Sequence, residues 1–159
     1  MVLAVLLFAA VPGSAPPTAA REGPAGPNFV FVLADDMRKD DLKYMRKIRA
    51  LLGDKGMRFV NAFVSYGLCC PSRATILRGQ YAHNHGVWSN GNDADAPDGE
   101  WEGFNAHGNE QDNLATRLDD AGYRTGLFGK YLNHYKETTV PPGWDDWFAL
   151  VSYGTSTIT

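Results

Sequence analysis

Apolar and polar positions divide the first part of the chain into two expected strands and a helix. Residues 28–36 (NFVFVLADD) form an uninterrupted apolar run that ends on two acids. A run without alternation is typical of a strand buried on both faces, as in a parallel sheet. Residues 57–65 (MRFVNAFVS) predict a second strand. Residues 40–56 predict a helix between them, because apolar side chains recur at helical spacing at Leu42, Met45, Ile48 and Leu52.

The middle of the chain combines a short helix with a long polar span. Residues 71–79 predict the helix, because Pro71 suits the first helical position and Gly79 suits the end. Residues 83–109 are polar and rich in glycine, and they show no clear period. A span of this length is unusual for an ordinary connection, so we expect a functional loop there.

The last part of the chain predicts a helix and two more strands. The helix is expected from residue 109 onward, with Leu114 and Leu118 facing the core. A glycine turn and a short strand at 123–128 follow it. Residues 140–159 turn at a Pro-Pro-Gly sequence and then alternate like a strand.

This order of elements predicts an α/β protein with a doubly wound, mostly parallel sheet that is flanked by helices. The 159 residues suffice for one domain of ordinary size. A parallel sheet needs both faces covered, and no helix is expected after the last strand. We therefore expect the first part of a longer protein, with the sheet truncated.

The N-terminus predicts export from the cytoplasm. Residues 1–20 combine an apolar run with small residues and prolines, which is typical of a secretory signal peptide, and residues 21–159 would form the mature chain. The apolar run at 2–11 is too short for a stable membrane span. No Lys or Arg precedes the run, so an uncleaved anchor or a misassigned start codon stays open. We expect a secreted, lysosomal or otherwise extracytoplasmic protein.

Charge and cysteine content exclude several classes of protein. The net charge of −3 offers no basic surface for nucleic acid. Only Cys69 and Cys70 are present, so the fold is not a disulfide scaffold, and adjacent cysteines rarely bridge each other. A structural zinc site would need a second cluster, whereas the four histidines are scattered. The pair is either two small buried residues or includes a reactive thiol at a helix N-terminus.

Several chemically active side chains follow the ends of the expected strands, where sites form in α/β sheets. Asp35 and Asp36 either cap a helix or bind Ca²⁺ or Mg²⁺. Cys69 comes at a helix N-terminus, where backbone amides favour an anion. Arg73 and Lys130 are either solvated bases or ligands of an oxyanion. Together these residues suit a tetrahedral anionic ester.

Three motifs give the chain a resemblance to the sulfatase family. They are C-x-P-S-R at 69–73, Asp-Asp at 35–36 and Gly-Lys-Tyr at 129–131, and the resemblance extends over about 27–150. The positions of proline and arginine select Cys69 and leave Cys70 as the variable residue. The sequences CCPSRATILRGQYAHNHGV, GKYLN and VPPGW most resemble the branch that holds N-acetylglucosamine-6-sulfatases and extracellular heparan endosulfatases. The resemblance implies the N-terminal part of an alkaline-phosphatase-like fold.

The resemblance also implies a mechanism. Cys69 would be oxidised by a formylglycine-generating enzyme, and the hydrated aldehyde would attack sulfur with one hydroxyl and expel sulfate with the other. Asp35, Asp36 and residue 69 would bind Ca²⁺, Arg73 would stabilise the hydrated aldehyde, and Lys130 would bind sulfate oxygens. Many sulfatases carry a histidine two residues after this lysine, where this chain has leucine.

Histidines of the 83–109 span offer a further candidate for substrate binding. His85 is placed where substrate contact is plausible, and a histidine on the surface without a role is the alternative.

Three functions stay open at this stage. The first is an exported sulfatase that acts on a sulfated sugar or glycosaminoglycan. The second is an inactive truncated product, because the family's later Asp-Asn pair, histidine and lysine have no positions in these 159 residues. The third is a related phosphonate or phosphodiester hydrolase, which would share the formylglycine, the metal and the fold.

Overall fold

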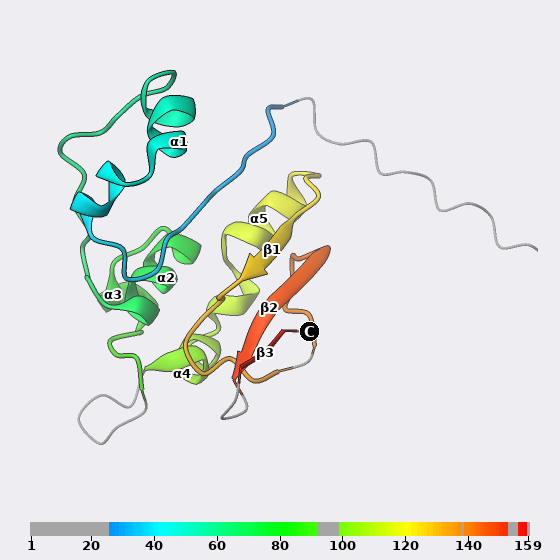
Figure 1. Cartoon of the computed structure of the whole chain (residues 1–159). Coiled ribbons are helices and arrows are strands. Elements are labelled where there is room, and N and C mark those ends of the chain that lie inside the picture. The colour runs from blue at the N-terminus through cyan, green and yellow to red at the C-terminus, as the bar shows by residue number, and fades with distance from the viewer. Residues whose placement is uncertain (1–25, 92–98, 138, 153–155, 159) are drawn as a thin grey trace, which may run out of the picture.

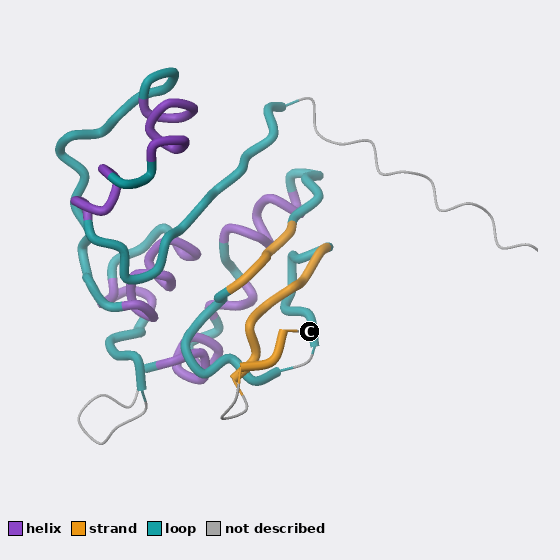
Figure 2. Tube along the Cα trace, in the orientation of Figure 1, coloured by secondary structure: helices purple, strands orange, loops and turns teal. Residues whose placement is uncertain are grey.

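The computed structural model of the chain describes residues 26–91, 99–137, 139–152 and 156–158. In this structure, helices lie on one side of a small sheet (Figure 1). Figure 1 shows the segment around α1 standing apart from the sheet, and Figure 2 shows how much of the chain between elements is loop. The predicted signal peptide at 1–20 lies outside the described residues. Among the helices that are described, none combines the length and the apolar character needed to cross a bilayer.

The sheet has three strands in the order β1-β2-β3. β1 (Gly126–Gly129) pairs in parallel with β2 (Asp146–Ser152), and β2 pairs in antiparallel fashion with β3 (Ser156–Ile158). The two late strands predicted from the sequence are therefore confirmed, the first with a shift of a few residues. The parallel pair and its flanking helices confirm the α/β class.

α2 (Cys69–Arg78) carries the cysteine motif. It follows Leu68 in extended conformation and ends at Gly79, whose φ of 63° lies in the left-handed region that glycine adopts without strain. The helix starts two residues earlier than the sequence predicted, so Pro71 is its third residue and not its first. Proline is tolerated there, because the N–H groups of the first turn have no partner within the helix.

The prediction of a loop over residues 83–109 is wrong, because part of this span is helical. It contains most of α3 (Ala82–His85), all of α4 (Glu100–Ala106) and the start of the 3₁₀ helix η3 (Asn109–Gln111). Trp101 and Phe104 on α4 are buried. A helix of seven residues is not stable in isolation, so α4 forms because its aromatic side chains pack in the core. The local sequence pattern does not predict this packing.

α5 (Leu114–Asp120) shows a second departure from the sequence pattern. Leu114 is 43% exposed and Leu118 is half-buried, whereas Ala115 is buried. The Asn113 side chain accepts hydrogen bonds from the N–H groups of Ala115 and Thr116 and so fixes where the helix starts. That starting point turns Ala115 inward, and the prediction that Leu114 faces the core is wrong.

The core joins the helices to the sheet through aromatic side chains. Its buried members are Cys70, Ala74, Val87, Trp101, Phe104, Tyr131, Leu132, Tyr135, Ala149 and Val151. Tyr131 packs edge-on against Tyr135 at 5.4 Å and against Trp147 at 5.0 Å between ring centroids. Edge-to-face packing of this kind adds to the stabilisation from apolar burial. It fixes the segment that directly follows β1, where Lys130 lies.

The two early strands do not form within the described residues. Residues 28–34 and 57–64 run outside any helix or strand, and Val30 and Phe63 are each 90% exposed. A buried parallel strand needs hydrogen-bonded neighbours and cover on both faces, and these segments have neither here. The predicted strands at 28–36 and 57–65 are therefore wrong for this structure.

The predicted helix at 40–56 is broken into three short pieces. These are the 3₁₀ helix η1 (Lys39–Lys43), α1 (Arg46–Ile48) and the π-helical turn η2 (Arg49–Gly53). None of the three buries a residue. An amphipathic helix takes most of its stability from packing of its apolar stripe, and this stripe has no surface to pack against.

Candidate active site

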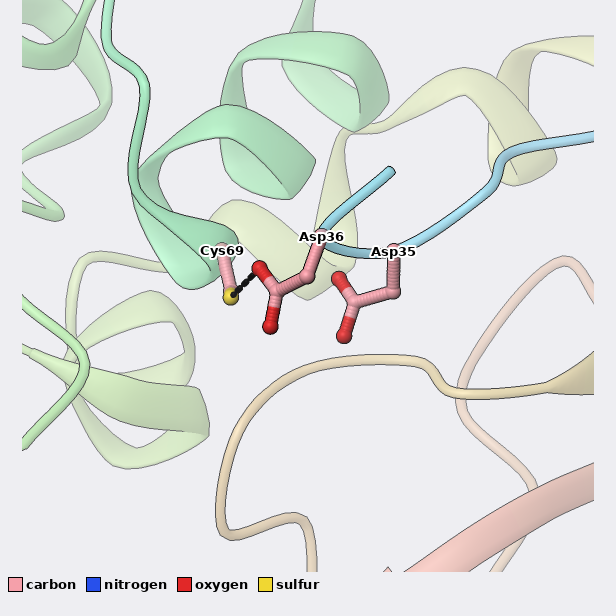
Figure 3. A group of neighbouring side chains, drawn as sticks. All are labelled: Asp35, Asp36 and Cys69. Atoms are coloured by element: carbon pink, nitrogen blue, oxygen red, sulfur yellow. Dashed lines mark hydrogen bonds between the residues drawn. The ribbon is translucent and has the colours of Figure 1, made fainter. Parts of the chain in front are cut away.

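Asp35, Asp36 and Cys69 lie together although α2 and the turn at 35–36 are far apart in the sequence. One ligand atom from each lies within 4.8 Å of the others (Figure 3). The Cys69 thiol donates to Asp36 Oδ1 at 3.5 Å. Asp36 has a φ of 53°, a left-handed conformation that aspartate tolerates better than most residues. Figure 3 shows both carboxylates on the same side of the turn, with the Cys69 sulfur beside them.

Two basic side chains hold the carboxylate of Asp35. Arg73 Nη2 donates to Oδ1 at 3.1 Å, and Lys130 Nζ donates to Oδ2 at 2.7 Å. Burial opposes ionisation of Asp35, but the hydrogen bonds and charges of Lys130 and Arg73 outweigh it and lower the pKa of this carboxyl. Asp35 is thus an anion that joins the first loop, α2 and the end of β1.

Arg73 is buried, so the surface-helix alternative for this residue is wrong. It is 8% exposed, and its Nη1 donates to the backbone carbonyls of Lys130 and Tyr131. Its Nε has no hydrogen-bond partner among the described residues. The guanidinium of Arg73 is therefore a fixed positive charge inside the fold, and it is paired with the carboxylate of Asp35.

The two cysteines have different environments. Cys69 is partly exposed beside Asp36, whereas Cys70 is fully buried in the core. Burial raises the pKa of the Cys70 thiol to about 11, so it stays protonated and unreactive at neutral pH. Cys70 therefore packs in the core as a small buried residue, which is one of the two alternatives that the sequence left open for the pair.

Asn90 is a residue of this region that the sequence analysis missed. Its Oδ1 accepts the backbone N–H of Cys70 at 2.8 Å. It thereby satisfies one donor in the first turn of α2 and ties the segment after α3 to the cysteine motif. Nothing in the local sequence signals this contact, because the two residues are 20 positions apart.

His85 lies in the interior, so the surface alternative is wrong. Its Nδ1 accepts the N–H of Val87 at 3.1 Å, and its Nε2 lies 3.0 Å from Thr75 Oγ1. These contacts suit a neutral ring protonated at Nε2, and burial, with a contribution from Arg78, lowers the pKa of His85. Substrate contact by His85 stays a prediction, although the ring is 0% exposed.

Leu132, which follows Lys130 by two residues, is also buried, at 3% exposure. The nearby His134 instead pairs through Nδ1 with Glu100 Oε1 at 2.9 Å.

The donor set suits a hard divalent cation. Two carboxylates on one side of a turn match the oxygen ligands that Ca²⁺ and Mg²⁺ prefer, whereas the unmodified thiol of Cys69 matches neither ion. The helix-capping alternative for Asp35 has no support here, since its carboxylate oxygens bind Arg73 and Lys130. The arrangement offers anionic ligands for a metal beside two cations for an oxyanion.

Comparisons with known proteins point in the same direction. The family model described as Sulfatase matches residues 27–157. The chain is 39% identical to the extracellular sulfatase SULF-1 homolog of Drosophila melanogaster over 79% of this chain and 11% of the relative. It is 39% identical to the N-acetylglucosamine-6-sulfatase of Capra hircus and 37% identical to that of Homo sapiens. These two matches cover 82% and 80% of this chain.

The chain spans only part of these relatives. It covers 11% of the fly protein and 24% of each of the two mammalian proteins. No solved structure matches the chain.

Proposed function

Because this chain belongs to the sulfatase family, we propose that the protein hydrolyses sulfuric esters of a sugar or glycosaminoglycan, with Cys69 as the precursor of the nucleophile. The observation that carries the proposal is the convergence on Asp35 of Arg73 and Lys130, beside Asp36 and Cys69. Sulfated sugars are favoured as substrates by the names of the relatives, which include N-acetylglucosamine-6-sulfatases.

In the proposed site Asp35, Asp36 and residue 69 hold Ca²⁺. Bound there, the ion would supply positive charge to the oxygens of the sulfate ester and to the nucleophile. Asp35 and Asp36 provide the negative charge that retains such an ion. The pKa of Asp35 is lowered by its hydrogen bonds to Lys130 and Arg73, so this ligand is ionised at neutral pH.

Residue 69, once converted to formylglycine, would supply a hydrated aldehyde whose two hydroxyls serve attack on sulfur and release of sulfate. Arg73 holds a fixed positive charge near this position, because backbone carbonyls clamp its guanidinium. Lys130 Nζ bonds Asp35 while its side chain is 26% exposed, so it can also donate to a sulfate oxygen. Both residues act as positioned cations for the anionic ester.

Two further features belong to this proposal. Conversion of Cys69 needs a formylglycine-generating enzyme as a partner, which would read Pro71 and Arg73 before the chain folds. Export through a signal peptide at residues 1–20 would bring the protein to an extracytoplasmic compartment. The name of the Drosophila melanogaster relative contains the word "extracellular", which supports this location.

Mass spectrometry tests the identity of the nucleophile. The chain is co-expressed with a formylglycine-generating enzyme and digested with trypsin. We expect the peptide that contains residues 69–73 to lose sulfur at Cys69, and a Cys70→Ala variant to be converted equally well. The Cys69→Ala variant is the matched control and shows no aldehyde. An aldehyde at Cys70 would contradict the proposed register of the motif.

We further propose that the 159-residue chain alone shows no turnover, even with Cys69 converted. Within the described residues the metal position offers only two carboxylates, and a cation with so few protein ligands binds weakly. The assay uses N-acetylglucosamine-6-sulfate, 4-nitrocatechol sulfate and a phosphodiester. Repeated turnover that the Cys69→Ala change abolishes would overturn this proposal. Turnover of the phosphodiester alone would favour the related hydrolase class.

A further inference from the structure

An open aromatic hollow lies outside the cluster of charged residues. It has a volume of about 360 Å³, within the usual range of ligand pockets of about 300–1,000 Å³. We call it the aromatic hollow, and its lining residues are Ser65, Tyr66, Tyr81, Ala82, His83 and Trp88.

The rings of the aromatic hollow are accessible, unlike those of the core. Tyr81 is 62% exposed and Trp88 is 43% exposed, whereas Tyr131 and Tyr135 in the core are each 1% exposed. Exposed rings that line one hollow present apolar surface to a ligand without contributing to the core.

Two ring pairs shape the aromatic hollow. Tyr66 and Trp88 meet edge to face with 6.2 Å between centroids. Tyr81 and His83 stack with 5.9 Å between centroids and an angle of 17° between their planes. No Asp, Glu, Lys or Arg is among the lining residues. The hollow therefore suits an uncharged molecule with a flat apolar face, and an isolated sulfate ion would find no lysine or arginine side chain in it.

The chain connects the aromatic hollow directly to the cysteine motif. Tyr66 precedes Cys69 by three residues, a span of at most about 10–11 Å. Trp88 precedes Asn90 by two residues, and Asn90 accepts the backbone N–H of Cys70 at 2.8 Å. The rings of Tyr66 and Trp88 are thus both carried by segments that connect to the first turn of α2.

We propose that the aromatic hollow binds the pyranose body of the sugar whose sulfate is directed toward residue 69. This inference rests on the proposed function for its choice of ligand. The C–H bonds on one face of a pyranose carry partial positive charge and pack against the electron-rich face of an aromatic ring. The uncharged hollow holds the sugar, while Lys130 and Arg73 receive the anionic group.

The division into two sites predicts which variants affect which ligand. Methyl N-acetyl-β-glucosaminide and its 6-O-sulfate are titrated into the 159-residue chain, with binding followed by two-dimensional NMR of backbone and indole N–H groups. We expect Trp88→Ala to weaken binding of both sugars about three- to tenfold. Tyr81→Ala should act in the same direction. Lys130→Ala should weaken binding of the sulfated sugar alone.

Two controls separate loss of contact from loss of structure. Tyr44→Ala removes another aromatic side chain, 74% exposed, that does not line the hollow, and it should leave both affinities unchanged. Trp88→Phe keeps a flat ring and should restore most of the affinity that Trp88→Ala loses. Dispersed spectra that match the parent chain outside the hollow show that each variant is folded.

The outcomes distinguish failure of the hollow from failure of the proposed function. Absence of sugar binding by the parent chain, or equal binding by parent and Trp88→Ala, overturns the hollow as a sugar site. Concentration-dependent association that Trp88→Ala abolishes, without any response to sugar, assigns the hollow to contact between copies and also overturns it. Sugar binding that depends on Trp88, in a protein whose Cys69 is never converted, leaves the hollow standing and contradicts the proposed hydrolase.

Discussion

Asp35 is the residue on which the charged site depends. It accepts hydrogen bonds from one base on α2 and one base after β1, and these two bases are 57 residues apart in the sequence. Arg73 is anchored to backbone carbonyls, so its charge stays in place when its partner is removed. Removal of Asp35 would leave two neighbouring cations without their shared anion.

We predict that Asp35→Asn lowers the free energy of unfolding by about 1–2 kcal/mol at pH 7. The loss is smaller than the 3–5 kcal/mol typical of a fully buried pair, because the Asp35 side chain is 37% exposed. Urea denaturation measures the difference. Asp36→Asn is the matched control and should change stability little, since its neighbouring partner is the weakly donating thiol of Cys69.

The pH dependence of the Asp35 variant has a defined sign. The pKa of Asp35 is lowered in the folded protein, so its stabilisation is complete above the ordinary value of 3.8 and is lost as the pH falls below it. The parent chain and Asp35→Asn should therefore converge in stability in acid. An unchanged difference between them at low pH would contradict the ion-pair assignment.

Glu110 offers a second test at the residue scale. It is 7% exposed, and its Oε1 accepts from Trp101 Nε1 at 2.6 Å and from the Tyr131 hydroxyl at 3.4 Å. Burial raises its pKa despite these hydrogen bonds, and the charge of Glu137 adds to the rise.

We predict that Glu110→Gln makes the protein more stable at pH 8 than the parent by about 1 kcal/mol, with no gain at pH 4. A raised pKa means that stability is complete below the ordinary value of 4.5 and falls as the pH rises through the folded-state pKa. Glutamine keeps an oxygen acceptor and carries no charge. Denaturation curves at both pH values measure the effect, and Glu110→Leu, which removes the acceptor, should destabilise at both.

At the scale of elements, the position of a helix start decides which side chains are buried. Asn113 is 1% exposed, its Oδ1 accepts from two N–H groups of α5, and its Nδ2 donates to the carbonyl of Glu110 at 2.8 Å. Asn113 thus caps α5 and also links α5 to η3. The apolar pattern alone placed Leu114 in the core, because the pattern cannot reveal the orientation that this cap imposes.

We predict that Asn113→Ala costs about 2 kcal/mol of unfolding free energy, at the upper end for a lost cap because a buried carbonyl also loses its donor. Leu114→Ala is the matched control and should cost less than about 1 kcal/mol, since Leu114 is 43% exposed. Thermal unfolding followed by circular dichroism compares the two. A loss of about 2–5 kcal/mol in Leu114→Ala would restore the inward orientation that the sequence pattern predicted.

At the scale of the whole molecule, the described part of the chain exposes the two apolar segments that were predicted as buried strands. Residues 29–33 and 57–64 carry side chains whose exposed fractions reach 90%. Contiguous apolar surface of this kind marks a surface that binds another surface or aggregates. It is the largest departure of this structure from the sheet that the sequence predicts.

We predict that the purified chain binds a hydrophobic dye, associates at raised concentration and unfolds with low cooperativity. A variant with Val30→Ser and Phe63→Ser, each replacing a side chain that is 90% exposed, should bind less dye and associate less. Replacing the buried Val151 by serine is the contrasting control and should increase dye binding, because it disrupts the core. Dye fluorescence and sedimentation velocity measure both effects. Equal dye binding and equal association by the parent chain and the double serine variant would show that these two segments are buried in solution.

Which residues meet at the candidate site was largely predictable from the sequence. Short stretches of sequence identified three candidates, which are the motif at 69–73, the acid pair at 35–36 and the lysine at 130. Residues from all three lie together in the structure. α2 and β1 were predictable too, because proline, glycine and apolar runs act on the backbone locally.

Only the tertiary structure decided how deeply each site residue is buried and which partner it takes. The sequence was compatible with an exposed or a buried position for Arg73 and for His85. Both are buried, because α2 packs against the segment that carries Lys130 and against α3, where Thr75 contacts His85. Such contacts join residues up to 95 positions apart, as between Lys130 and Asp35. The free energy of a buried charge or ring depends on neighbours brought from distant parts of the chain, and no local pattern of apolar and polar positions contains that information.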